Sequence, residues 1–279
     1  MDNVSKHLSV ACLQYTSTKD EMLTLKIIKQ LIEKAIDLGA EFIALPECAT
    51  SLHENSTITK NLAKPEVENF SLQVLKKLAK SKGIYILIGS LPIKLGNKIT
   101  NRSFLIGSNG KILYKYDKIH LYDVNLPNGE IYKESDTYSS GDKAIVGQIE
   151  ENKFKIGMTI CYDLRFPNLY QDLARNGAEI ITVPSAFSNV TGPCHWHTLL
   201  KARAIETGSF IIAPAQTGKH QCGRKTFGHS LIISPWGKVL VDGKKKVGVV
   251  HAKINLEEVT MARRAIPNLS INKEYSTNT

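Results

Sequence analysis

The stretch Ile-Gly-Met-Thr-Ile-Cys-Tyr-Asp-Leu-Arg-Phe-Pro, residues 156–167, places a cysteine between an apolar run and a proline. Phe154–Ile160 is apolar enough for a buried strand, and Pro167–Asn176 begins with proline and is followed by glycine, as helices often are. A strand, a tight turn and a helix in this order expose the side chain at the turn. We therefore predict that Cys161 is a nucleophile and that the Tyr162 N–H lies beside it as an oxyanion donor.

Two more reactive side chains directly follow apolar runs. Glu47 comes after Phe42-Ile43-Ala44-Leu45-Pro46, and Lys118 comes after Tyr114-Lys115-Tyr116-Asp117. A thiol that cleaves an amide needs a base for its proton and a group that stabilises the oxyanion. Glu47 can act as the base, and a buried Lys118 beside acids stays charged and can hold the oxyanion. Together the three residues predict cleavage of an amide or a related carbonyl compound.

Strands alternate with helical patterns along the chain, and hairpins interrupt the alternation. This order predicts an α/β fold with two mixed sheets between outer helices, an α-β-β-α sandwich. Residues at the carboxyl ends of strands meet in one crevice in such folds. We expect helices over Glu66–Lys82 and His195–Thr207, and an irregular loop over His120–Gly141. We also expect one domain over residues 1–267 and a polar tail over residues 268–279.

The composition is that of an ordinary globular protein, with 279 residues, 42% of them hydrophobic and a net charge of +10. The densest basic run, Lys244-Lys245-Lys246, has no aromatic platform, so we expect no nucleic-acid partner. Five cysteines without paired spacing indicate a reducing compartment, and we expect a cytoplasmic protein. The sequence has neither a signal-peptide core nor the ~18 apolar residues that span a bilayer, so we expect no membrane contact.

The three motifs occur in an order that resembles the nitrilase, or carbon–nitrogen hydrolase, superfamily. They are Leu45-Pro46-Glu47, Tyr116-Asp117-Lys118-Ile119-His120-Leu121 and residues 161–167, and the resemblance extends over residues 8–261. It implies the same α-β-β-α sandwich, with Glu47, Lys118 and Cys161 as catalytic residues. It also implies a homodimer or a larger homo-oligomer, formed through helices beside the site, and catalysis with no organic cofactor and no metal.

The resemblance further implies a second glutamate in the loop that follows the lysine. Glu134 in Lys133-Glu134-Ser135 matches it, and Glu130 and Asp136 are the alternatives. We expect Glu134 to orient Lys118 and the water that takes part in the reaction.

Other segments resemble one branch of the superfamily, which contains deaminated glutathione amidase and ω-amidase. They are residues 183–187, 191–196, 202–206 and 228–230, and residues 166–167 and 215–220 are more similar to the former enzyme. This resemblance implies a cysteine amidase that hydrolyses a terminal amide of a small α-keto acid amide, such as deaminated glutathione, through a thioester. Its alternatives are an ω-amidase acting on α-ketoglutaramate, an N-carbamoyl amidohydrolase, a nitrilase, and a binding protein of the same fold without catalysis.

Tyr162, Arg165 and Thr191 are the expected substrate contacts. For Arg165, we favour a competing interpretation over substrate contact, in which it forms a buried ion pair with Glu206 or another acid. A loop flanked by glycines carries basic residues that could contact an anionic substrate, although solvation is the ordinary state of such a loop; they are Lys219, His220 and Arg224.

The run Cys194-His195-Trp196-His197 superficially resembles a metal site. Because side chains two positions apart on a helix do not face each other, His195 and His197 cannot bind one ion together, and we expect no metal.

Overall fold

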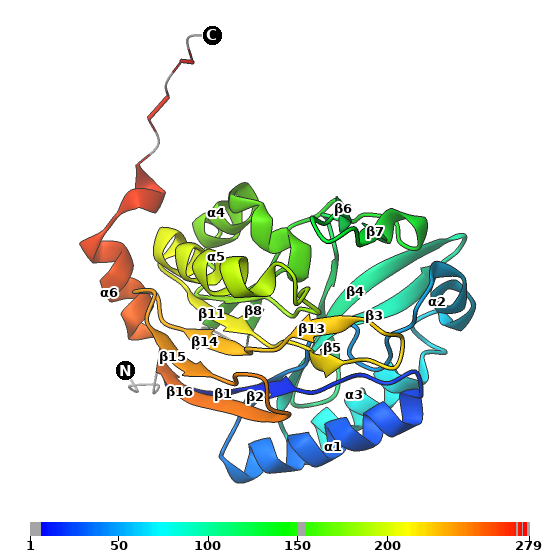
Figure 1. Ribbon diagram of the computed structural model, residues 1–279. Helices are drawn as coiled ribbons and strands as arrows, with labels where there is room; N and C mark the ends of the chain where they lie inside the picture. Colours follow the sequence, from blue (N-terminus) through cyan, green and yellow to red (C-terminus); the bar gives the residue numbers. More distant parts are fainter. Residues whose placement is uncertain (1–6, 150–153, 272, 275, 278–279) are drawn as a thin grey trace.

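Two six-stranded sheets lie face to face in the computed structural model, which describes residues 7–149, 154–271, 273–274 and 276–277 (Figure 1). The first sheet has the order β16-β1-β2-β3-β4-β5, with β1 His7–Gln14, β2 Phe42–Ala44, β3 Tyr85–Leu95, β4 Lys98–Ile106, β5 Ile112–Asp117 and β16 Gly248–Asn255. The second has the order β15-β14-β11-β10-β9-β8, with β8 Ile145–Ile149, β9 Phe154–Met158, β10 Ile180–Thr182, β11 Phe210–Ala213, β14 Leu231–Ile233 and β15 Val239–Asp242.

Both sheets are mixed. Strands β1, β2 and β3 run parallel to one another, as do β9, β10 and β11, and the outer strands of both sheets pair antiparallel. Two small hairpins complete the strands, β6 Asp123–Asn125 with β7 Ile131–Lys133 and β12 Thr217–Lys219 with β13 Lys225–Phe227. The helices are α1 Glu21–Asp37, α2 Ser56–Leu62, α3 Phe70–Lys82, α4 Pro167–Arg175, α5 Gly192–Thr207 and α6 Glu257–Ala265.

Alternating apolar residues build the layers. In β1, Ala11 and Leu13 face α1 and α3, whereas Val10 and Cys12 face the second sheet, because successive strand residues point to opposite faces. Phe42 meets Phe154 of the other sheet edge to face, with ring centroids 6.4 Å apart. Helices α4 and α5 cover the outer face of the second sheet (Figure 1). The predicted α-β-β-α sandwich is confirmed.

Three details differ from the sequence prediction. Helix α5 begins at Gly192, not at His195, because Pro193 fits the first turn of a helix. Helix α3 begins at Phe70, not at Glu66, because the Asn69 side chain accepts the Leu72 N–H at 2.9 Å and caps the helix there. The expected irregular loop, residues 120–141, contains the hairpin β6–β7 and a 3-10 turn, η1 Glu134–Asp136. Backbone pairing within that short hairpin organises a segment whose composition is polar.

Two further expectations concern the domain boundary near the end of the chain and membrane-spanning helices. After α6, the 3-10 turn η3 Asn268–Ser270 contacts helix α5, because the Asn268 amide donates to the Glu206 carbonyl at 2.7 Å. The boundaries of one domain over residues 1–267 and a tail over residues 268–279 stay a prediction. Among the helices in the described ranges, none combines the length and the apolar character required to cross a membrane.

Candidate active site

Cys161 lies at the strained turn between a strand and a helix. β9 ends at Met158, Cys161 opens the 3-10 turn η2 Cys161–Arg165, and α4 follows. The φ angle of Cys161 is +48°, in the left-handed region that residues other than glycine rarely adopt. The Cys161 N–H donates to the Pro184 carbonyl at 3.0 Å, which helps to hold the turn. Strain of this kind is often found at functional sites, and Cys161 lines a cavity of about 540 Å³.

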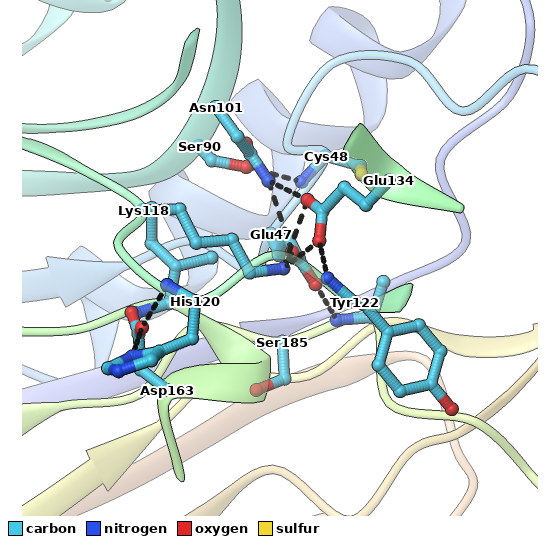
Figure 2. Close-up of polar contacts among 12 residues, drawn as sticks. Glu47, Cys48, Ser90, Asn101, Lys118, His120, Tyr122, Glu134, Asp163 and Ser185 are labelled. Atoms are coloured by element: carbon cyan, nitrogen blue, oxygen red, sulfur yellow. Dashed lines mark hydrogen bonds and ion pairs between the residues drawn. The ribbon is translucent and has the colours of Figure 1, made fainter. Parts of the chain in front are cut away.

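A buried carboxylate joins this turn to the segment that carries Lys118. Asp163 accepts the Ile160 N–H at 2.8 Å and the Tyr116 hydroxyl at 2.7 Å. Its other oxygen accepts the His120 N–H at 3.1 Å (Figure 2). The sequence analysis assigned no role to Asp163, although an acid two residues after a nucleophile is a visible signal. The contacts keep the two reactive segments at a constant separation.

Glu47 is positioned by close packing of the backbone behind it. A Cβ atom on Gly89 of β3 would lie 2.2 Å from the Leu45 carbonyl oxygen, so only glycine lets the two segments approach this closely. The Gln216 amide donates to the Glu47 carbonyl at 3.0 Å, and the Ala186 N–H donates to Glu47 Oε2 at 2.8 Å. The Glu47 segment is therefore packed against β3 of the first sheet, and Glu47 accepts hydrogen bonds from segments that follow strands of the second sheet.

The Lys118 ammonium lies between two carboxylates (Figure 2). Its Nζ donates to Glu47 Oε1 at 2.8 Å and to the Glu134 oxygens at 3.0 and 2.8 Å. Asn101 bridges the two carboxylates, since its amide donates to Glu47 at 3.2 Å and to Glu134 at 3.0 Å. The sequence analysis gave Asn101 no role. Lys118 is only 2% exposed and Glu47 only 4%, so this charged network lies in the interior.

The structure distinguishes Glu134 from its two sequence neighbours. Besides Lys118, Glu134 accepts the Tyr122 N–H at 2.7 Å (Figure 2). Glu130 instead bonds Asn128 and Tyr132 at the surface, and Asp136 reaches the cavity wall. Of these three acids, only Glu134 forms an ion pair with Lys118 among the contacts of the described residues.

Burial and neighbouring charge set the protonation of the three groups. Burial raises the pKa of the Cys161 thiol well above 9.0, and the Glu47 charge raises it further. Burial favours the neutral acid at Glu47, but the Lys118 charge outweighs it and lowers the pKa of Glu47 below 4.5. Burial opposes the charge of Lys118, but Glu134 and Glu47 hold the pKa of Lys118 well above 10.5. The resting site therefore holds a neutral thiol, a carboxylate ready to accept its proton, and an ammonium.

This charge state predicts a broad pH plateau. Because the pKa of Glu47 is lowered and that of Cys161 is raised, the same three protonation states persist through neutral pH. We expect kcat/KM for a neutral amide to stay flat from about pH 5 to about pH 9. A pH series, checked by circular dichroism for intact folding at each pH, measures this. An acidic limb centred between about pH 6 and pH 7 would contradict the lowered pKa of Glu47.

All three expected substrate contacts, Tyr162, Arg165 and Thr191, line the same cavity of about 540 Å³ as Cys161, Glu47 and Lys118. The favoured ion pair of Arg165 with Glu206 is wrong. Glu206 pairs with Arg203 at 2.8 Å, because the two residues are neighbours three positions apart on α5. Arg165 donates to His195 Nδ1 at 3.2 Å and lies over the rings of Tyr162 and Phe187.

The three basic residues of the loop that was expected to be solvated lie in three different environments. Lys219 is exposed, and His220 is buried, with its ring nitrogens bonded to Ser17 and Thr226. Arg224 directly precedes β13 in the sequence, and it reaches the wall of the cavity. The hairpin β12–β13 causes this division, because it turns one side of the loop towards the site.

A possible metal-ligand set lies away from the cavity. His195 and His197 do point apart, but His197, His229 and Asp242 bring three ligand atoms within 4.8 Å of one another. Asp242 is already engaged by His229 at 3.0 Å, by His197 at 3.2 Å and by the Lys244 ammonium at 2.9 Å. The hydrogen bonds account for the cluster, and the ammonium disfavours a second cation there.

The profile of the carbon-nitrogen hydrolase family matches residues 9–264. The chain belongs to the carbon-nitrogen hydrolase family. It is therefore a hydrolase that acts on carbon–nitrogen bonds. The suspected superfamily is confirmed over nearly the full length of the chain.

Relatives of this carbon-nitrogen hydrolase include the deaminated glutathione amidase of Synechocystis sp., which is 39% identical over 263 residues, 93% of this chain and 96% of that protein. Among solved structures, the Saccharomyces cerevisiae Nit3 protein of the nitrilase superfamily superposes with a TM-score of 0.84 and 30% identity, over 94% of both chains. The Caenorhabditis elegans NitFhit protein superposes with a TM-score of 0.88 and 32% identity; the match covers 96% of this chain but only 65% of that one.

Proposed function

We propose that this carbon-nitrogen hydrolase is a cysteine amidase that cleaves the amide bond of a small α-keto acid amide, with deaminated glutathione as its preferred substrate. The buried network of Glu47, Lys118 and Glu134, on the same cavity wall as Cys161, carries the proposal. The name of the Synechocystis relative supports the choice of substrate. The cavity of about 540 Å³ is large enough for a ligand of this size.

In the first half of the proposed reaction, Glu47 takes the thiol proton as the Cys161 sulfur attacks the carbonyl carbon. The carbon–sulfur bond forms, and the carbonyl electron pair moves to oxygen. The Lys118 ammonium and the Tyr162 N–H stabilise this oxyanion. Collapse breaks the carbon–nitrogen bond, and the leaving amine takes the proton from Glu47. A thioester remains on Cys161.

Water completes the cycle in the second half. Glu47 takes a proton from a water molecule as its oxygen attacks the thioester carbon. The carbon–sulfur bond then breaks, and the sulfur recovers its proton from Glu47. We assign Glu134 to positioning Lys118 and this water, since both oxygens of Glu134 accept hydrogen bonds from the ammonium (Figure 2).

The leaving group differs between the two branch substrates. α-Ketoglutaramate releases ammonia, as expected for a terminal amide. Deaminated glutathione instead releases cysteinylglycine, whose amino group formed the amide bond. The acyl part, a keto acid with a free carboxylate, is the same in both. A site that accepts the larger leaving group must be open on that side, and the partly exposed Arg165 and Thr191 lie on the cavity wall.

A substrate comparison tests the proposed function. We expect kcat/KM for deaminated glutathione to exceed that for α-ketoglutaramate by about tenfold or more, because contacts with the dipeptide add binding energy. The assay follows 2-oxoglutarate, cysteinylglycine and ammonia by mass spectrometry, with an N-carbamoyl amino acid and a nitrile as comparison substrates. Carbon dioxide released with ammonia would favour the carbamoyl reaction, and no turnover of any amide would favour a silent binding protein.

We also propose a homodimer or larger homo-oligomer in the cytoplasm. Ile205 on α5 and Trp236 are large apolar side chains that are 52% and 62% exposed. They lie near each other, since a Cβ on Gly237 would contact Ile205 at 2.7 Å. Exposed apolar groups that gather on one surface favour an interface. The five cysteines are unpaired, as expected in a reducing compartment.

A further inference from the structure

The guanidinium group of Arg224 is a positive charge at the wall of the active-site cavity that lacks a carboxylate partner. Its Nη2 donates to the Ala186 carbonyl at 2.6 Å, and its Cζ atom lies 5.3 Å from the centre of the Tyr132 ring. Its Nε atom is buried and meets no acceptor. Within the described part of the chain, no aspartate or glutamate forms an ion pair with it. Arg224 is therefore held in place while part of its hydrogen-bonding capacity is unused.

Three other cations with little exposure are neutralised by carboxylates, whereas Arg263 donates to backbone carbonyls and to a serine hydroxyl. Lys118 is bonded to two carboxylates, Arg203 pairs with Glu206 at 2.8 Å, and Arg102 pairs with Asp117 at 2.6 Å. Leaving a buried charged donor without an acceptor costs free energy, because water that would have satisfied it has been removed. A cation kept in this condition at the wall of a ligand cavity is suited to receive an anion from the ligand.

Arg224 is also connected to the reaction centre through a single residue, Ala186. The Ala186 carbonyl accepts its guanidinium, and the Ala186 N–H donates to the Glu47 carboxylate at 2.8 Å. The Arg224 charge counts among the influences that lower the pKa of Glu47 and of Cys161, although burial is the larger influence on both. Its position is thus set relative to the groups that attack the amide.

The buried Nε atom of Arg224 indicates which end of the substrate the guanidinium contacts. The acyl part stays attached to Cys161 as a thioester, whereas the amine must leave and water must enter. The acyl part therefore belongs on the enclosed side of the cavity, and the leaving group on the open side. Arg224 Nε is buried and meets no acceptor, whereas Arg165, the other arginine of the cavity, is already bonded to His195.

We propose that Arg224 binds the carboxylate of the substrate's acyl part and so selects amides of dicarboxylic acids over neutral amides. Bidentate pairing of a guanidinium with a carboxylate is strong and directional, and it places the far carbonyl at a defined distance from the sulfur. The inference rests on the proposed function, since it names the substrate group that this same site recognises.

Paired substrates test the assignment by turnover. Glutaramate carries the carboxylate, and pentanamide has a methyl group in its place. For Arg224→Gln we expect kcat/KM with glutaramate to fall about 10- to 100-fold, the loss expected for a hydrogen bond to a charged group, and kcat/KM with pentanamide to change by less than about threefold. Lys225→Gln removes an exposed charge from the next residue and is the matched control.

Three outcomes of this comparison would overturn the assignment. Equal losses on both substrates would mean that Arg224 acts through Glu47 or Cys161 and binds no carboxylate. A loss specific to glutaramate in Arg165→Gln, but absent in Arg224→Gln, would move the subsite to Arg165. Unchanged discrimination in Arg224→Gln would exclude the subsite altogether. Arg224→Lys keeps the charge without the planar fork, so we expect it to recover part of the loss.

A binding measurement tests whether Arg224 binds a carboxylate even if the protein turns over no amide. Calorimetry of glutarate with Cys161→Ala measures carboxylate binding without chemistry, and we expect Cys161→Ala/Arg224→Gln to bind about 10- to 100-fold more weakly. Cys161→Ala/Lys225→Gln should bind as Cys161→Ala does, and thermal unfolding checks that each variant is folded. If Cys161→Ala does not bind glutarate, or binds it equally with and without Arg224, the inference is wrong.

Discussion

Replacing Cys161 with alanine is expected to lower kcat by at least about 10⁴-fold while the protein stays folded. The sulfur is the only group in the proposed mechanism that forms a bond with the substrate, so no neighbour can replace it. The backbone already adopts φ +48° at this position with a non-glycine residue, and alanine tolerates that angle as poorly as cysteine does. We therefore expect little change in stability.

Cys48 provides the matched control for this prediction. It lines the same cavity, follows Glu47 directly and also has a left-handed backbone, with φ 54°. Burial and then the Glu47 charge raise the pKa of its thiol to about 12. We expect Cys48→Ala to keep activity within about tenfold of the unmodified enzyme, since this thiol has no role in the proposed reaction. Stopped-time product assays measure both variants, and normal turnover by Cys161→Ala would disprove the assignment of the nucleophile.

Replacing Lys118 with methionine is expected to remove activity and to destabilise the fold together. The change leaves the buried carboxylates of Glu47 and Glu134 facing each other without a cation. Breaking a buried ion pair by removing one partner typically costs about 3–5 kcal/mol of unfolding free energy. Loss of the oxyanion donor should lower kcat by a further factor of about 10²–10³ in the molecules that remain folded.

Lys115 on β5, three residues before Lys118, distinguishes this effect from the loss of any lysine. Its ammonium pairs with Glu66 at 2.6 Å, but its side chain is 44% exposed. Exposed pairs contribute at most about 1 kcal/mol, so Lys115→Met should unfold nearly as the unmodified protein does. Urea unfolding measures both variants. Equal stability of Lys118→Met and Lys115→Met would show that the interior network is not a structural ion pair.

A second substitution separates charge repulsion from packing. Adding Glu134→Gln to Lys118→Met removes one of the two opposed carboxylates and should recover part of the lost stability. Because the residues are in direct contact, their effects should not add, and a coupling of about 0.5–3 kcal/mol is expected. Strictly additive losses would assign the destabilisation to the shape of the lysine side chain and not to its charge.

Local sequence predicted much of the fold and part of the site. The strand, turn and helix around Cys161 follow from an apolar run, a proline and a glycine, all within one short segment. The layers follow from alternation, since Ala11 and Val10 face opposite sides of one strand. These features depend on near neighbours in the chain, so composition and spacing were sufficient to predict them.

Features that depend on distant partners were missed or wrong. Arg165 was expected to pair with Glu206, but Arg203, one helical turn from Glu206, pairs with it instead. For Arg224, solvation was expected as the ordinary state and contact with an anionic substrate as the alternative, and its actual position depends on Tyr132 and Ala186, which lie far from it in sequence. No periodicity in the chain reports on contacts of this kind.

The sequence by itself determined the chemical types at the site, an acid, an amine and a thiol at three strand ends, and the layered fold that carries them. Only the tertiary structure decided how they are charged and which further groups join them. Protonation depends on burial and on charges a few ångströms away, and the glutamate that contacts Lys118 is selected by distance in space. Folding sets both quantities by bringing Glu47, Lys118, Glu134 and Cys161 from four separate segments to one cavity wall.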